Sequence, residues 1–175
     1  MHWFKKTNID TKNYKVIIDN LVKDMKPIND ERYSTRGLNA KQYDLYDFKD
    51  SISTIVDHVK IELKKIFNKP FYNLVAAWTV YSEENSYHLV HRHNYENSNH
   101  ISSVLYLSIP DNINLHQSGN FYYFMKNKDN NISYNHITPK LGDLFFLPAN
   151  MFHGTYPQAK GLRQTLNLDF EVYDA

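Results

Sequence analysis

The spacing of apolar residues changes near residue 70. Before it, apolar positions recur at helical spacing in 14–25 (YKVIIDNLVKDM) and more clearly in 46–67 (YDFKDSISTIVDHVKIELKKIF). Asn68 and Pro70 are expected to end the second helix. Its apolar face is formed by Phe48, Ile52, Ile55, Val56, Val59, Leu63 and Ile66. The pattern predicts two or three helices in this part of the chain, with a polar loop over 29–44.

After residue 70, short segments rich in β-branched and aromatic residues alternate with Gly, Pro, Asn and Asp. Helices followed by at least seven such strands are typical of a helical layer packed against a β-sandwich or jelly roll. We therefore expect a single domain over 1–175, with a helical support region over 1–70 and a jelly-roll core over 71–175. The clearest strand segments are 71–81, 100–110, 119–127, 131–139, 142–148 and 163–173.

The composition and charge of the chain argue against several classes of function. The formal net charge is +1, so no overall field favours nucleic acid, and no apolar run reaches the roughly 18 residues of a membrane-spanning helix. The first residues, MHWFKKTNIDTKNYK, lack the apolar stretch of a signal peptide. Without cysteine, a metal site would have to use His, Asp or Glu. These features favour a cytoplasmic protein, or one of the host cytoplasm if the source is viral.

Four of the nine histidines lie in 86–102 (SYHLVHRHNYENSNHIS). Residues i and i+2 of a strand project from the same face, so His91 and His93 could reach one metal ion. His153 follows the apolar segment of 142–157 (GDLFFLPANMFHGTYP), and a jelly roll can bring such distant strands opposite each other. The three histidines are therefore candidate ligands. The other two in the stretch, His88 and His100, are expected in solvent or in the core.

A positive charge interrupts the last apolar strand, 162–170 (LRQTLNLDF). Arg163 and Thr165 lie off its apolar face and share a direction, and a guanidinium beside a hydroxyl is a good receptor for a carboxylate. Burying the charge without an anion would be costly. The alternative is an ion pair of Arg163 with Asp169 or Glu171. The apolar face comprises Leu162, Leu166, Leu168 and Phe170.

In their order and spacing, these segments resemble the Fe(II)- and 2-oxoglutarate-dependent oxygenases, in particular a small bacterial and phage branch that is similar to prolyl hydroxylases. The resemblance implies a double-stranded β-helix and a dioxygenase that uses Fe(II), 2-oxoglutarate and O₂ to hydroxylate an unidentified small molecule or peptide. It extends from about Trp78 to Phe170 and is carried by 78-WTVY-81, 91-HRH-93, 102-SSVLYL-107, 142-GDLFFLPANMFHG-154 and 163-RQT-165.

The resemblance also implies which residues hold the metal. His91 and His153 would be the two histidine ligands of the family, and His93 stands where most of the superfamily has a carboxylate. The segment 94-NYENSNH-100 adds residues relative to the family, and its Glu96 is the alternative third ligand.

Four further residues would hold the cosubstrate. By resemblance, Arg163 binds the distal carboxylate of 2-oxoglutarate, with Thr165 beside it and Tyr106 bonded to the same carboxylate. Tyr81 stands where a further cosubstrate-contacting tyrosine is common. Both tyrosines would also suit a plain aromatic core.

Two other functions remain open at this stage. His91, His93 and Glu96, followed by the 142–153 segment, are also similar to a cupin, which would be a metal enzyme that does not use 2-oxoglutarate. A non-catalytic jelly-roll binding module would bind no metal. A cupin gives no reason for Arg163 ten residues after His153.

Overall fold

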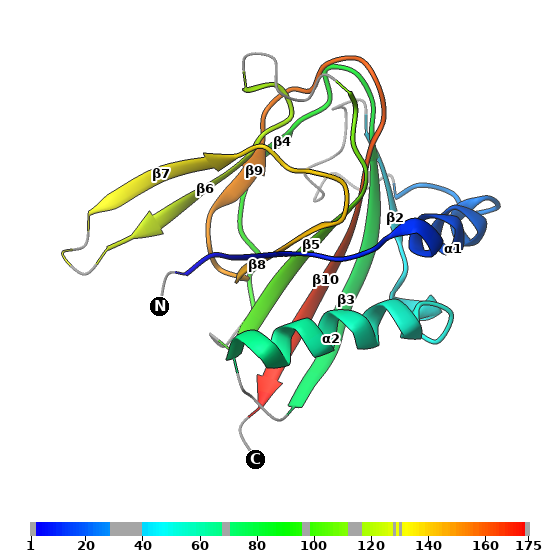
Figure 1. Ribbon diagram of the computed structural model, residues 1–175, viewed down its shortest axis with the longest axis horizontal. Coiled ribbons are helices and arrows are strands. Elements are labelled where there is room, and N and C mark those ends of the chain that lie inside the picture. Colours follow the sequence, from blue (N-terminus) through cyan, green and yellow to red (C-terminus); the bar gives the residue numbers. More distant parts are fainter. Residues whose placement is uncertain are drawn as a thin grey trace.

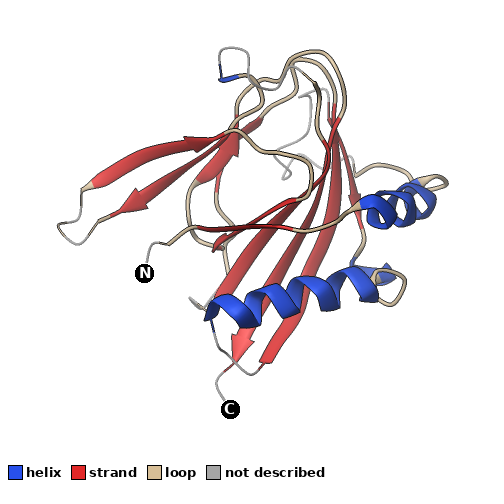
Figure 2. Ribbon diagram, in the orientation of Figure 1, coloured by secondary structure: helices blue, strands red, loops and turns tan. Residues whose placement is uncertain are grey.

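Two antiparallel β-sheets face each other in the structure, a computed structural model that describes residues 3–28, 40–67, 71–95, 99–111, 117–127, 129 and 131–173. Two helices cover the outer face of the larger sheet, and the β6–β7 hairpin projects away from the body of the molecule (Figure 1). The prediction of a mainly β jelly roll with helices before it is confirmed (Figure 2).

The larger sheet has the strand order β1-β8-β5-β10-β3-β2. Its strands are β1 (Lys5–Asn8), β2 (Ala40–Asp44), β3 (Phe71–Ser82), β5 (His100–Ser108), β8 (Asp143–Pro148) and β10 (Arg163–Tyr173). The smaller sheet has the order β4-β9-β6-β7. Its strands are β4 (His88–His91), β6 (Phe121–Lys126), β7 (Ile132–Ile137) and β9 (His153–Thr155).

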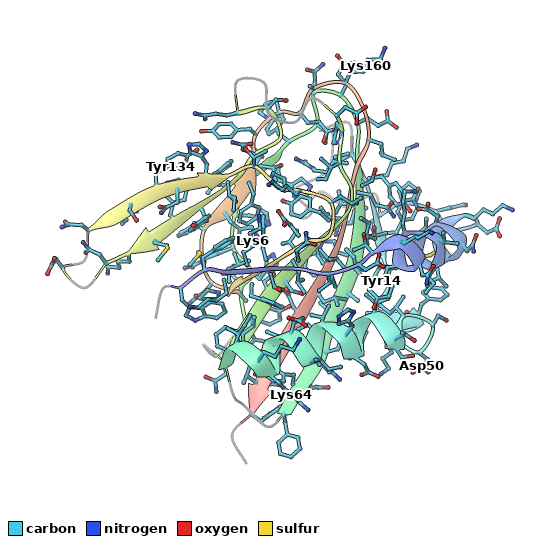
Figure 3. The ribbon with its side chains drawn as sticks, viewed as in Figure 1. Lys6, Tyr14, Asp50, Lys64, Tyr134 and Lys160 are labelled. Atoms are coloured by element: carbon cyan, nitrogen blue, oxygen red, sulfur yellow. The ribbon has the colours of Figure 1, made fainter. Side chains whose placement is uncertain are left out.

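Helix α1 (Lys12–Val22) and helix α2 (Ser53–Phe67) form the support layer. They are joined by a hydrogen bond of 2.6 Å between the Tyr14 hydroxyl and His58 Nδ1 (Tyr14 is labelled in Figure 3). The predicted 46–67 helix is divided into a 3₁₀ turn, η1 (Tyr46–Phe48), and α2. The Leu45 N–H donates to the Ala77 carbonyl of β3, which ties the chain to the sheet just before η1.

Strand alternation creates two cores, one on each face of the larger sheet. On β10, Leu166, Leu168 and Phe170 face the helices and are fully buried, which stabilises the fold by about 1.5–3 kcal/mol for each side chain. Arg163 and Thr165 lie on the opposite face, toward the smaller sheet, as their positions in the strand predict.

The 1–70 region also supplies two strands that the sequence did not reveal. β1 is fastened to β8 by an ion pair of 2.7 Å between Lys6 and Asp143 (Lys6 is labelled in Figure 3), and β2 forms the opposite edge of the sheet. Residues 40–44 of the predicted 29–44 loop form β2, and the rest of that loop lies outside the described residues. Asn68 and Pro70, which were expected to end the second helix, also lie outside them. Neither described helix has the length and apolar character needed to cross a membrane.

Candidate metal centre

A cavity of about 460 Å³ lies between the two sheets. Its walls carry polar side chains from both sides: histidines from the β4–β9 side, and an arginine, an aspartate and hydroxyl groups from β5 and β10. The polar residues used below are His88, His91, His93, Tyr106, His153, Thr155, Arg163, Thr165 and Asp169. Six candidate residues that lie far apart in the sequence therefore line one cavity: His91, His93, Tyr106, His153, Arg163 and Thr165.

Three histidines form a cluster on one side of this cavity. His91 ends β4 and is the register partner of His153 at the start of β9. Nitrogen atoms of His91, His93 and His153 all lie within 4.8 Å of one another. The ring centroids are 4.4 Å apart for His91 and His153, and 5.3 Å apart for His93 and His153. Glu96, the alternative third ligand, lies outside the described residues.

His93 reaches the cluster differently from the expected strand geometry. β4 ends at His91, so the two side chains do not share a strand face. Instead, the His93 N–H donates to the Ala149 carbonyl at 2.8 Å, which holds the chain against the segment between β8 and β9. The position of His93 is thus fixed by a contact that the H-x-H spacing does not encode.

Each ring of the cluster has its Nδ1 atom occupied. His91 Nδ1 donates to the Leu89 carbonyl at 2.8 Å, and His153 Nδ1 donates to the Met151 carbonyl at 2.8 Å. These oxygens only accept, so both Nδ1 atoms carry hydrogen and both Nε2 lone pairs are free to bind a metal. Burial lowers the pKa of both rings, with a smaller contribution from the neighbouring imidazoles. Both are therefore neutral, as metal ligands must be.

Asp169 completes the same pattern at His93. Its Oδ2 accepts from His93 Nδ1 at 2.7 Å, so the Nε2 of this ring is also left free. All three rings therefore have a hydrogen-bonded Nδ1 and an Nε2 that is free to bind a metal. From the sequence, Asp169 was expected only as a possible partner of Arg163, although its position six residues after Arg163 on β10 places it on the same face of the strand, toward the cavity.

A buried cation also lines the cavity. Arg163 is only 2% exposed. Its guanidinium donates to the Gly119 carbonyl at 3.2 Å and to Thr155 Oγ1 at 3.1 Å. Within the described residues, Arg163 has no carboxylate partner, and Asp169, one of the two partners considered from the sequence, contacts His93 instead. A guanidinium held in this way is a preformed receptor for an anion.

Two hydroxyl groups accompany Arg163. Tyr106 is fully buried and lines the cavity, and its hydroxyl has no partner among the residues described. Burial raises the pKa of Tyr106, although the charge of Arg163 opposes the rise, so the phenol stays protonated and can donate. Thr165 also lines the cavity, and its Oγ1 accepts from Asn167 Nδ2 at 3.2 Å. Three of the predicted cosubstrate residues are thus brought together.

Tyr81, the fourth predicted cosubstrate residue, is not brought to the cavity. Its hydroxyl donates to Asp19 of α1 at 2.6 Å and accepts from Gln164 Nε2 at 2.8 Å, on the helix-covered face of the larger sheet. The reason is strand alternation, since Trp78 and Ser82 of β3 face the cavity and Tyr81 points to the opposite side.

His88, which was expected in solvent or in the core, lines the cavity. Its Nε2 is buried and has no hydrogen-bond partner in the described part of the chain. Its backbone N–H donates to Thr155 Oγ1 at 2.9 Å, the same hydroxyl oxygen that accepts from Arg163. An irregularity in the β4–β9 pairing lies between His88 and His91, and it has no signature in the sequence.

Comparisons with known proteins identify the family of this chain and similar folds. A family model described as 2OG-Fe(II) oxygenase matches residues 76–169. A search of curated proteins finds no match. Among solved structures, a prolyl-4-hydroxylase from Pseudomonas putida is 15% identical, with a TM-score of 0.66 over 98% of this chain and 93% of that chain.

Two further structures are similar in fold. HygX from Streptomyces hygroscopicus, solved with nickel and 2-oxoglutarate bound, is 13% identical, with a TM-score of 0.68 over 96% of this chain and 82% of that chain. SnoN, a non-heme alpha-ketoglutarate-dependent epimerase from nogalamycin biosynthesis, is 10% identical, with a TM-score of 0.73 over 98% of this chain and 78% of that chain. The same architecture therefore carries more than one chemistry.

Proposed function

Because this chain belongs to the 2OG-Fe(II) oxygenase family, we propose that it hydroxylates a C–H bond of a small-molecule or peptide substrate. The observation that carries the proposal is the presence, in one cavity, of a three-histidine cluster and a buried arginine without a carboxylate partner among the described residues. Fe(II) and 2-oxoglutarate are the metal and cosubstrate of this family. The cavity, at about 460 Å³, has the size of an ordinary small-molecule site.

We assign the metal to His91, His93 and His153, each binding through Nε2. The assignment is supported by the three occupied Nδ1 atoms and by the proximity of the ligand nitrogens, within 4.8 Å. Three ligands on one side leave positions open for cosubstrate and O₂. When bound, Fe(II) and 2-oxoglutarate supply with O₂ the oxidising power for hydroxylation, and 2-oxoglutarate leaves as succinate and CO₂.

The cosubstrate carboxylate is assigned to Arg163 and Tyr106. The guanidinium supplies charge and directed N–H groups, while the buried phenol supplies a proton that is not otherwise used among the described residues. Thr165 lies beside them on the same strand face, and Thr155 holds Arg163 in place. His88, next to Thr155, adds a ring nitrogen that can bond the same anion.

Apolar side chains form part of the remaining walls. Val104 and Phe121 are at most 6% exposed and line the cavity from opposite sheets. Trp78 packs against His93, with ring centroids 5.4 Å apart. Such buried apolar surface beside the polar groups strengthens the electrostatic contacts that they make.

The family membership favours this function over the two alternatives raised by the sequence. A cupin-type enzyme that does not use 2-oxoglutarate, or a non-catalytic binding module, would leave the buried charge of Arg163 without a purpose.

The proposal is tested by turnover. We expect protein supplied with Fe(II), 2-oxoglutarate and O₂ to release succinate slowly even without its substrate, and faster when a substrate from a panel of amino acids, peptides and small metabolites is accepted. The accepted compound should gain one oxygen atom from labelled O₂, detected by mass spectrometry.

His153→Ala is the control, because it removes one assigned ligand. Succinate that forms without O₂, or at an equal rate in His153→Ala, would contradict the proposed chemistry. A product that gains no oxygen would contradict hydroxylation while leaving the family membership intact.

A further inference from the structure

Two acidic residues of the described chain, Asp44 and Asp169, line the cavity, and Asp169 is the one hydrogen-bonded to the histidine cluster; it is 1% exposed. Its Oδ2 atom accepts two hydrogen bonds, from His93 Nδ1 at 2.7 Å and from the Tyr95 hydroxyl at 2.6 Å. Its Oδ1 atom is buried and has no partner among the described residues. The carboxylate is thus held firmly, but its charge is only partly compensated.

A buried carboxylate of this kind requires positive charge nearby. No lysine or arginine of the described chain forms an ion pair with Asp169, whose carboxylate instead accepts a hydrogen bond from the ring of His93. That ring presents its free Nε2 to the cluster formed with His91 and His153. A divalent cation bound there would supply the missing charge, one imidazole away from the carboxylate.

The histidine cluster, in turn, lacks a negatively charged ligand. Non-haem iron oxygenases ordinarily use two histidines and one carboxylate, whereas the three ligands assigned here are neutral imidazoles. We propose that Asp169 is a positioning residue that acts through His93, fixing the ring with Nε2 toward the metal and making this ligand a more basic, more anionic donor. This inference rests on the assignment of His93 as a ligand in the proposed function.

Residues around Asp169 support this role. The Tyr95 ring stacks on His100, with centroids 4.0 Å apart and planes at 4°, so the hydroxyl that donates to Asp169 is itself held in place. Trp78 packs edge-on against His93 from another direction. The rotation of the carboxylate and of the imidazole is therefore restricted on several sides, which a positioning role requires.

The test measures Co(II) binding, with Co(II) standing in for Fe(II), by titration and by the visible absorption spectrum of the bound ion. Asp169→Asn keeps the shape of the side chain and removes its charge. We expect about 10- to 100-fold weaker Co(II) binding and a changed absorption spectrum, in line with the loss of other partners that orient a metal ligand.

A double-mutant comparison shows whether the effect passes through His93. In a His93→Ala background, Asp169→Asn should cause no further loss of Co(II) affinity. Asp143→Asn is the matched control, because Asp143 is equally buried at 1% exposure, pairs with Lys6, and does not line the cavity. Its Co(II) affinity should equal that of the unchanged protein.

Tyr95→Phe is the second variant, and it decides the question if Asp169→Asn does not fold. It retains the carboxylate but removes one of its two donors, so a smaller loss of Co(II) affinity and a shifted spectrum are expected. Unchanged affinity and spectrum in this variant would then overturn the proposal.

The outcomes separate this inference from the proposed function. If the unchanged protein binds no Co(II), the metal assignment fails and the role of Asp169 fails with it. If the unchanged protein binds Co(II) and Asp169→Asn binds it equally well, only the role of Asp169 is overturned. An additive loss in the His93→Ala background would likewise overturn it, because Asp169 would then act by another route.

Discussion

Single residues of the cavity have protonation states set by their surroundings. Burial, together with the positive charge of Arg163, lowers the pKa of His88 to about 3, and burial lowers the pKa of His153 well below the ordinary value of 6.5. In the unfolded chain both rings titrate near 6.5. Between these values, the unfolded state binds protons that the folded state does not.

The metal-free protein should therefore lose stability as the pH falls from about 6.5 toward about 3, because stability rises with pH wherever the unfolded state holds more protons. In this pH window, each such histidine changes the free energy of unfolding by up to about 1.4 kcal/mol per pH unit. The check is urea denaturation of the metal-free protein at a series of pH values.

His88→Phe should reduce the slope, whereas His136→Gln, which changes an exposed histidine on β7, serves as the comparison. A slope in His88→Phe as steep as that of the unchanged protein would show that His88 is not held neutral by the fold.

Much of the site could be read at the residue scale. Arg163 and Thr165 face the cavity because alternation along β10 separates them from the apolar face, and the same reasoning applied to Asp169 would have found it. Alternation also places Tyr81 on the helix side, where a match to a family motif had suggested the cavity. His88 could not be found in this way, because the irregularity after it breaks the alternation.

At the scale of elements, two tyrosines on neighbouring parts of the larger sheet have opposite roles. Tyr81 on β3 fastens α1 to the sheet through Asp19, and Tyr106 on β5 faces the cavity with a hydroxyl that has no partner among the described residues. Removing each hydroxyl should therefore have opposite consequences.

Tyr81→Phe should lower the free energy of unfolding by about 1 kcal/mol and leave 2-oxoglutarate affinity unchanged, because it breaks hydrogen bonds outside the cavity. Tyr106→Phe should weaken 2-oxoglutarate binding with little loss of stability, since it removes a buried hydroxyl without a described partner. Denaturant titration and calorimetry measure the two quantities. The reverse pattern would return Tyr81 to the cosubstrate site.

Long elements could be predicted and short ones could not. The amphipathic α2 and the strands β3, β5, β8 and β10 carry enough residues for their periodicity to be visible. β9 has three residues and β1 has four, and their strand character comes from the neighbours that they pair with. The histidine cluster depends on β4 and β9, so its motif was visible while its geometry was not.

At the scale of the whole molecule, the two sheets supply different halves of the site. His91 and His153 come from β4 and β9 of the smaller sheet, while Arg163 and Tyr106 come from the larger sheet. The contact between His93 and Asp169 of β10 joins the two halves. Since 2-oxoglutarate would bridge them, its binding should depend both on the metal and on Arg163.

The most direct test of this arrangement is calorimetric titration of 2-oxoglutarate into anaerobic, Fe(II)-loaded protein. We predict saturable binding that weakens when the metal is removed. In Arg163→Leu, the affinity should fall roughly 30- to 1,000-fold, from a loss of about 2–4 kcal/mol, while Fe(II) is retained. Arg163→Lys should restore it only in part, because an ammonium lacks the planar fork. Equal affinity in Arg163→Leu, or binding that is indifferent to the metal, would contradict the assignment of this cavity as a 2-oxoglutarate and Fe(II) site.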